Sequence, residues 1–230
     1  MFMKKLLLTL LVTFVAAQTN AQQWISLFDG KTMNGWHSFG KTTAGEAWKV
    51  EDGAIVFDPA VKQAGKSAGD IVTNESFNDF HLQLEWKISK NGNSGIIFFV
   101  QDNPSKYNET WHTGPEMQVL DNDGHPDGKI ISHRAGNLYD LIVGKEGVVK
   151  PYDQWNKVDI IFKDNKLDLI LNDVSMVSTH VGDDGWKELI RRSKFSKGES
   201  PDFAKVFSGH IALQDHGDKV SYRNIRIQKL

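Results

Sequence analysis

The sequence predicts an all-β protein, a two-sheet antiparallel sandwich of jelly-roll type. Three observations predict this fold: apolar and polar residues alternate over most of the chain, the turns are rich in Gly and Asn, and only one segment has helical spacing. Many short strands joined by such turns are typical of a sandwich. The chain has 230 residues, of which 40% are hydrophobic, so we expect one large domain over 22–230.

The first 21 residues are expected to be a secretory signal peptide. Lys4 and Lys5 precede an apolar run that ends at Ala17, and this run is shorter than the roughly 20 residues of a membrane span. The chain has no Cys, which excludes a lipoprotein anchor, disulfides and thiolate metal sites. We therefore expect an exported protein without a membrane anchor, in a bacterial periplasm or secreted.

The clearest strand is 80–89, where every even-numbered residue from Phe80 to Ile88 is apolar and the residues between them are polar. The following "KNGNSG" at 90–95 has the composition of a hairpin turn. "IIFFV" at 96–100 is apolar on both faces and predicts a central strand.

The second half of the chain continues the alternation. Residues 156–177 predict two or three strands, with a tight turn at Asp164-Asn165. A short helix is expected near 184–194, with Asp183 or Asp184 as its cap and arginines in its last turn. The last strand loses its two-residue step between Tyr222 and Ile225, which predicts a β-bulge.

Several classes of function are disfavoured by what the sequence lacks. The net charge of -2 gives no electrostatic reason for a nucleic-acid partner. No GxSxG elbow, P-loop or GxGxxG after a strand is present, which argues against a serine hydrolase and a nucleotide enzyme.

The segment "GPEMQVLDN" at 114–122 contains the first candidate site residues. Alternation places Met117 and Val119 in the core and leaves Glu116 and Gln118 together on the other face. Gln214 and His216 resemble them, because they also lie beside turn residues at a strand end, where sites are often found. The polar residues at 81, 83 and 85 share a face too, but ordinary solvent-facing positions explain them better.

Glu116 and Asp121 do not make a convincing glycosidase pair. At about 3.3 Å per residue, five residues of strand separate them by roughly 15 Å, unless the chain bends at Asp121. The usual mechanism needs two carboxylates much closer than this.

A metal-binding site is retained as an alternative. "DNDGHPDG" at 121–128 offers alternate oxygen ligands but departs from a calcium-binding loop, and a polar turn explains it better. His133 and His216 are candidate ligands without a supporting spaced motif. No cofactor is certain, and a divalent metal is retained as an alternative.

Several motifs across the predicted mature chain resemble one known family. They include an opening "WISLFDGKTMNGWH", "NSGIIFFV", "PEMQVLDN" followed by "AGNLYDLI", and a closing "GHIALQDHGDKVSYRNIRI". Together they resemble the 3-keto-disaccharide hydrolase family, and the closing block is the most specific of them. The sequence departs from the family at Tyr222, where Phe or Trp is frequent, and at "LNDV", where "LNG" is common.

The resemblance implies a concanavalin- or laminarinase-like jelly roll that cleaves glycosides already oxidised to a ketone at C3. Such an enzyme would act after a separate sugar C3 oxidoreductase, on an oligosaccharide or glycoside. The ketone acidifies the C2 proton, so a base forms an enolate, the C1 aglycone is eliminated, and water adds back. This chemistry needs a base, a group that stabilises the enolate oxygen, and an acid.

The resemblance suggests roles for named residues. Glu116 or His216 would be the base, and His216 is favoured because its ordinary pKa already lies near ambient pH. Residues expected to hold sugar hydroxyls or the enolate oxygen are Gln118, Gln214 and Arg223. Residues expected to orient the sugar or protonate the aglycone are Asp121, His133 and Tyr139. Trp111 is expected to stack on a sugar face.

Two other functions remain as alternatives. A non-catalytic, lectin-like glycan-binding module would use the same sandwich, but it needs no acid–base pair in one pocket. An ordinary endo-glycosidase of laminarinase type would show an "E-x-D-x-x-E"-like run, which is not found.

Overall fold

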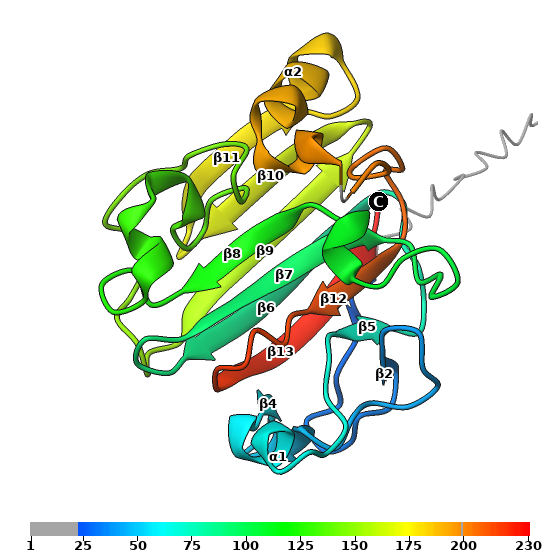
Figure 1. Cartoon of the computed structure of the whole chain (residues 1–230), viewed down its shortest axis with the longest axis vertical. Helices are drawn as coiled ribbons and strands as arrows, with labels where there is room; N and C mark the ends of the chain where they lie inside the picture. Colours follow the sequence, from blue (N-terminus) through cyan, green and yellow to red (C-terminus); the bar gives the residue numbers. More distant parts are fainter. Residues whose placement is uncertain (1–22, 199) are drawn as a thin grey trace, which may run out of the picture.

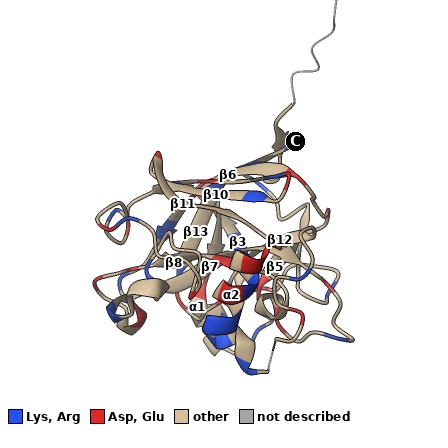
Figure 2. Cartoon of the chain, turned by 90° about the horizontal axis from the view of Figure 1, so that it is seen from above, with Lys and Arg blue, Asp and Glu red and all other residues tan. Residues whose placement is uncertain are grey.

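The computed structural model describes residues 23–198 and 200–230, which form two antiparallel sheets packed face to face (Figures 1 and 2). This confirms the predicted fold class. The predicted signal peptide, residues 1–21, lies outside the described residues. Within the described part of the chain, no helix has the length and hydrophobicity needed to cross a bilayer.

The larger sheet has eight strands. Its path, from one edge to the other, is β11 (Val174–His180), β10 (Lys166–Leu171), β9 (Asn156–Lys163), β6 (Phe80–Ile88), β13 (Val220–Lys229), β4 (Ala54–Phe57) and β3 (Trp48–Glu51), with β1 (Ile25–Ser26) paired to β13.

The smaller sheet has five strands and faces the viewer in Figure 1. Its order is β2 (Trp36–Ser38), β5 (Ile71–Thr73), β12 (His210–Leu213), β7 (Asn93–Val100) and β8 (Glu116–Leu120). The short helices are α1 (Pro59–Gln63), α2 (Asp184–Arg192) and the 3-10 turns η1 (Thr110–His112), η2 (Pro126–Lys129), η3 (Ile131–His133) and η4 (Lys194–Lys197).

The core lies between the sheets and follows the alternation of the sequence. Along β6 the even-numbered residues are buried and the intervening residues are partly exposed. The Phe80 ring of the larger sheet meets Phe99 of the smaller sheet at a centroid distance of 6.2 Å. As predicted, β7 is central, because it pairs with β12 on one side and β8 on the other.

The predicted hairpin at "KNGNSG" is wrong. The turn carries the chain from β6 in the larger sheet to β7 in the smaller one, and the two strands are not paired. Asn91 adopts a φ of 59°, so these residue types do supply the sharp reversal. Residue type fixes the local reversal, but only packing decides which sheet receives the next strand.

The other local predictions agree with the structure. Asp164 and Asn165 form the β9–β10 hairpin turn with φ of 50° and 62°. The pairing of β13 with β6 shifts register between Arg223 and Arg226, which confirms the bulge. Asp183 caps α2 by accepting the Trp186 N–H at 2.7 Å, and the helix ends two residues before the predicted boundary.

Candidate active site

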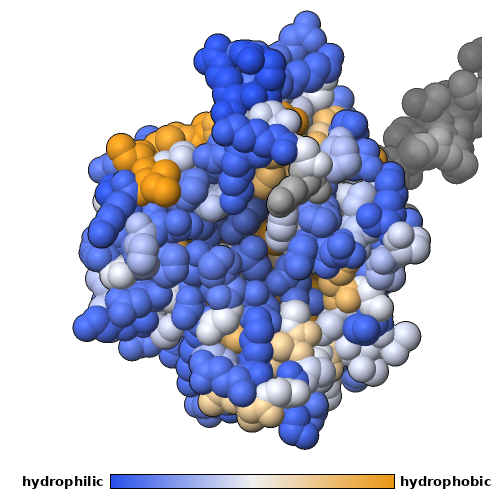
Figure 3. Space-filling view, viewed as in Figure 1, coloured by the Kyte–Doolittle hydropathy of each residue, from blue (hydrophilic) through white to orange (hydrophobic). Residues whose placement is uncertain are grey.

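A cavity of about 440 Å³ lies over the outer face of the smaller sheet. Figure 3 looks onto this face, which is mostly hydrophilic. The residues around the cavity come from the sheet and from the loops above it: Asn93, Trp111, Glu116, Gln118, Tyr139, Lys194, Phe195, Lys197, Ser200, Gln214 and His216.

Strand register brings the polar residues of the sheet together. Glu116 of β8 lies opposite Ile97 of β7, and Gln118 lies opposite Gly95. The Gln214 N–H donates to the Gly95 carbonyl at 3.0 Å, on the β12 side of β7. Residues opposite each other in a sheet share a face, so Glu116 and Gln118 point into the cavity while Met117 packs in the core.

Gly95 makes room for the Glu116 side chain. A Cβ at position 95 would lie 2.1 Å from Glu116 Oε1 and 2.6 Å from its Cδ. The absence of a side chain on β7 therefore lets the carboxyl group lie across the strand. This explains the Gly in "NSGI" without any need for a left-handed backbone.

Glu116 is a buried carboxyl group, 7% exposed, without a hydrogen bond to any other described residue. Its pKa is raised to about 8, chiefly by burial; the Lys194 ammonium opposes the rise, and the charges of Asp70 and Asp127 contribute to it. At neutral pH this group therefore carries a proton for most of the time.

His216 is shifted in the opposite sense. Burial lowers its pKa from the usual 6.5, with Asp218 opposing the shift and His125 adding to it. The His125 ring lies edge-on to His216 with centroids 6.2 Å apart. At neutral pH His216 is thus an unprotonated imidazole. One cavity contains a protonated carboxyl and a neutral imidazole, which is the pairing that acid–base catalysis requires.

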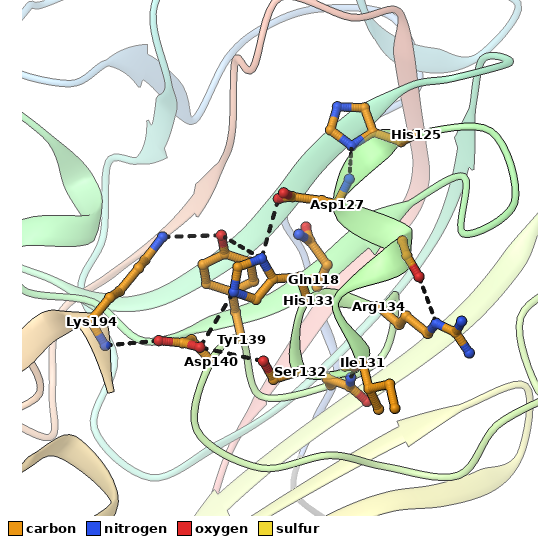
Figure 4. A network of polar contacts seen from close by, with 12 residues as sticks. Gln118, His125, Asp127, Ile131, Ser132, His133, Arg134, Tyr139, Asp140 and Lys194 are labelled. Carbon is orange, nitrogen blue, oxygen red and sulfur yellow. Dashed lines mark hydrogen bonds and ion pairs between the residues drawn. The ribbon is translucent and has the colours of Figure 1, made fainter. Parts of the chain in front are cut away.

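Tyr139 and Lys194 form a second polar cluster at the cavity wall (Figure 4). Lys194 Nζ donates to the Tyr139 hydroxyl at 3.0 Å and lies 4.2 Å from the centre of its ring. His133 lies behind Tyr139, with its Nδ1 3.4 Å from the hydroxyl and its Nε2 3.3 Å from Asp140. Burial raises the pKa of Tyr139, so its hydroxyl stays protonated.

Asp70 forms hydrogen bonds with two segments that contribute residues to the cavity lining. It accepts a hydrogen bond from the hydroxyl of Thr110, the neighbour of Trp111, and its Oδ1 accepts the Asp215 N–H at 2.8 Å. Asp215 stands between Gln214 and His216 in the chain. Burial raises the pKa of Asp70 to about 7, against the hydrogen bond from Thr110.

Most of the predicted site residues meet in this cavity. Those that line it are Trp111, Glu116, Gln118, Tyr139, Gln214 and His216. His133 contacts Tyr139 from outside the lining.

Asp121 and Arg223 lie elsewhere. Asp121 is buried at the end of β8, accepts the Asn91 N–H at 2.8 Å and lines a separate cavity. Its carboxylate stabilises the β6–β7 connection and does not line the main cavity. Among the described residues, Glu116 is then the only carboxylate lining the main cavity.

Arg223 belongs to the opposite sheet. Its Nη2 pairs with Glu85 at 2.7 Å, and its guanidinium lies 4.0 Å from the centre of the Trp155 ring. Although only nine residues separate it from Gln214 in sequence, the connection from β12 to β13 changes sheets. The partly exposed polar residues of β6 likewise face outward from the larger sheet.

The sequence interpretation missed several lining residues. These are Asn93, Lys194, Phe195, Lys197 and Ser200. Asn93 begins the "NSGI" motif, which was noticed only as a strand. The others follow α2 as the structure has it, in a segment whose position over the sheet has no sequence signature.

No three His, Cys, Asp or Glu side chains converge as a metal site in the described part of the chain. The calcium-like segment forms turns and η2, where His125 Nδ1 accepts the Asp127 N–H at 3.1 Å.

Comparison with known proteins identifies relatives. Residues 23–228 match the family described as the 3-keto-alpha-glucoside-1,2-lyase-like domain. A 3-keto-disaccharide hydrolase from Bacteroides thetaiotaomicron is 36% identical, with 92% of this chain and 80% of that protein covered.

Solved structures support the same fold. One from Parabacteroides distasonis, provisionally assigned as a glycosyl hydrolase, has a TM-score of 0.80 and 32% identity over 90% of this chain and 94% of its own. A second from that organism, with the same provisional assignment, has a TM-score of 0.66 and 21% identity, covering 90% and 100% of the two chains.

Proposed function

The chain belongs to the family of 3-keto-alpha-glucoside-1,2-lyase-like domains, and from this premise we propose that it cleaves 3-keto-glycosides by elimination followed by hydration. As a member of that family it is a hydrolase that acts on sugars. The proposal is carried by one observation: Glu116 and His216 line the same cavity with pKa values shifted in opposite directions.

The proposed reaction begins at C2 of the oxidised ring. A base takes the C2 proton, and the electron pair of that bond forms an enolate with the C3 carbonyl. The enolate then re-forms the ketone, a C1–C2 double bond forms, and the C1–O bond breaks as the aglycone oxygen gains a proton. Water adds to C1 and a proton returns to C2, so that hydrolysis is the net result.

We assign the base to His216 and the acid to Glu116. His216 is neutral at pH 7 and accepts the C2 proton, whereas Glu116 is protonated and donates to the departing aglycone. Once Glu116 has lost its proton, the Lys194 ammonium stabilises the carboxylate, and that carboxylate can activate the incoming water. The base preferred from sequence is thus retained, and Glu116 takes the acid role.

The enolate oxygen needs donors that are in place before the reaction. Lys194 and Lys197 both line the cavity, and the contact of Lys194 with Tyr139 restricts its position. Gln118 and Gln214 add amide groups on the sheet floor. We propose that Lys194 stabilises the enolate oxygen while the two amides bind sugar hydroxyls.

The cavity does not favour an ordinary two-carboxylate glycosidase. Of the described residues, Glu116 alone supplies a carboxylate to its lining, so the second acid of that mechanism has no candidate there. The proposed roles use protein side chains throughout, so activity should survive treatment with EDTA; loss that added divalent metal restores would show that a metal is required.

The substrate must come from an oxidation at C3. A separate sugar oxidoreductase would supply it, and the unoxidised glycoside should not be cleaved, because its C2 proton lacks the acidifying ketone. Equal cleavage of oxidised and unoxidised glycosides would contradict the proposal. We also propose that the protein works after export, in a periplasm or outside the cell.

The decisive test compares two aglycones. A p-nitrophenolate leaves without an acid, whereas methanol needs one. Glu116→Gln should therefore lose most activity on the 3-keto methyl α-glucoside and little on the 3-keto p-nitrophenyl α-glucoside. His216→Ala should lose activity on both.

The assignment also predicts the pH profile of the wild type. The rate should rise as His216 loses its proton, below pH 6.5, and fall as Glu116 loses its proton near pH 8. With the p-nitrophenyl aglycone, the decrease in rate near pH 8 should be absent. Equal loss on both aglycones in Glu116→Gln, or a fall at high pH with both, would contradict the acid role.

A further inference from the structure

Two buried polar atoms at the cavity have no hydrogen-bond partner among the described residues: Asn93 Oδ1 and Ser200 Oγ. The two residues are 2% and 4% exposed. Native proteins leave few buried polar atoms unpaired, and each such atom needs an explanation. Both of these line the same cavity, which points to the missing partner being a ligand.

The backbone of Asn93 is fixed, so a small shift does not supply a partner. Asn93 is the first residue of β7 and lies opposite Leu120 of β8. Its N–H donates to Asp218 Oδ2 at 3.1 Å. Its side chain is therefore directed by two strands and by the loop that follows His216.

Ser200 is fixed from the other side of the cavity. Its carbonyl accepts the Phe203 N–H at 3.0 Å, and the Ala204 N–H donates to the Thr113 carbonyl at 2.8 Å. The Phe203 ring stacks on Phe195 with centroids 3.8 Å apart and an angle of 6°. The Ser200 hydroxyl thus belongs to an anchored wall above the sheet.

The chemistry of Asn93 Oδ1 restricts the ligand group, whereas the Ser200 hydroxyl can donate or accept. A carboxamide oxygen only accepts hydrogen bonds, so its partner must donate. A ketone has no proton to donate, and the C3 oxygen of an oxidised sugar cannot satisfy Asn93 Oδ1. The other ring hydroxyls can, and they are present whether or not C3 is oxidised.

We infer that Asn93 and Ser200 form a hydroxyl-binding subsite in which Asn93 Oδ1 accepts from a ring hydroxyl other than the one at C3, so that oxidised and unoxidised glycosides both bind. The inference rests on the proposed function, since it assumes that the sugar ring occupies this cavity. Selection for the oxidised sugar then comes from the acidity of its C2 proton. The unoxidised glycoside should be a competitive inhibitor.

The test measures binding separately from turnover. Titration calorimetry with unoxidised p-nitrophenyl α-glucoside gives Kd, and hydrolysis of its 3-keto derivative gives kcat and KM. Asn93→Ala and Ser200→Ala should each weaken binding of the unoxidised compound about 10-fold, the loss of one hydrogen bond. They should raise KM more than they lower kcat.

Ser178→Ala is the matched control, because Ser178 is exposed on β11 of the opposite sheet. Melting temperature separates binding from a structural role. Since Asn93 Oδ1 and Ser200 Oγ have no hydrogen-bond partner among the described residues, their removal should leave the melting temperature unchanged or slightly higher. A clear fall in melting temperature without a change in Kd would assign them to the fold and overturn the subsite.

The inference and the proposed function fail in different ways. If the wild type hydrolyses the 3-keto compound but does not bind the unoxidised one, or if both variants bind as the wild type does, the subsite is wrong. If the wild type binds the unoxidised compound through Asn93 and Ser200 but does not hydrolyse the 3-keto compound, the proposed function is wrong. Absence of both binding and hydrolysis overturns both.

Discussion

The two outer faces of the sandwich carry similar polar side chains but differ in how those groups are paired. On the larger sheet, Glu85 accepts from Arg223 at 2.7 Å, and His81 lies 2.7 Å from Asp159. On the smaller sheet, the carboxyl group of Glu116 has no hydrogen bond to any other described residue. In the sequence, Glu116 and Gln118 alternate with apolar residues just as Gln83 and Glu85 do.

This difference in pairing distinguishes a ligand-binding face of a sheet from a face that is only exposed to solvent. A face whose polar groups pair with one another is complete without a ligand. A cavity that buries an unpaired carboxyl, a carboxamide oxygen and a hydroxyl is costly for the folded protein, and a ligand that pairs with those groups offsets the cost. The variants below contrast the two faces residue by residue.

The largest contrast is expected between the two histidines. His216→Ala should lower kcat on a 3-keto-glycoside by about 100- to 10,000-fold, because the base is lost. His81→Ala should leave kcat unchanged and cost about 1 kcal/mol of stability through the lost contact with Asp159. Steady-state kinetics and thermal unfolding check both. A comparable fall in kcat in the two variants would remove the distinction between the faces.

Gly95→Ala tests the space for the Glu116 carboxyl. The added Cβ would lie 2.1 Å from Oε1, so the carboxyl must move, and kcat on the methyl aglycone should fall on the order of 100-fold. Gly185→Ala on α2 is the control, since the nearest atom to its Cβ lies 3.3 Å away and Gly185 is exposed. Unchanged activity in a folded Gly95→Ala would show that the position of Glu116 does not matter.

Asp70→Asn tests the support beneath the cavity. We expect kcat to fall about 10-fold, because the bonds to Thr110 and the Asp215 N–H weaken. The Asp70 charge raises the pKa of Glu116, while Lys194 lowers it and Asp127 raises it. Removal of that charge should therefore move the alkaline fall of the pH profile to lower pH. Asp159→Asn on the larger sheet should leave the pH profile of kcat unchanged.

The smallest contrast concerns stability. Because the folded pKa of Glu116 is about 8 and the ordinary value is 4.5, the folded state binds the extra proton, and stability falls as pH rises between these values. Glu116→Gln removes this loss, so its gain in unfolding free energy should grow with pH to a few kcal/mol near pH 8. Glu85→Gln should show no such gain. Chemical denaturation at pH 5 and pH 8 measures both.

Prediction from sequence succeeded where one strand or one turn contains all the information. The alternation of β6, the bulge after Tyr222 and the Asp183 cap are properties of a few adjacent residues. The same reasoning failed at "KNGNSG", where it chose a hairpin over a change of sheet.

The candidate site was predicted in part for the same reason. Glu116 and Gln118 share a face by alternation alone. Arg223 was misplaced because proximity in sequence does not indicate which sheet a strand joins. Lys194 and Ser200 were missed because they reach the cavity from the segment after α2.

The sequence by itself determined the sandwich, the facing of individual side chains and, through its motifs, the family. These features follow from backbone geometry over short stretches, where the two-residue period of a strand leaves no choice. Tertiary structure alone decided which polar face became a cavity. It buried Glu116 over Gly95 and placed His216 beside the same space. It also left Asn93 Oδ1 and Ser200 Oγ without a hydrogen bond to any described residue, because the pairing and desolvation of a group depend on distant segments of the chain.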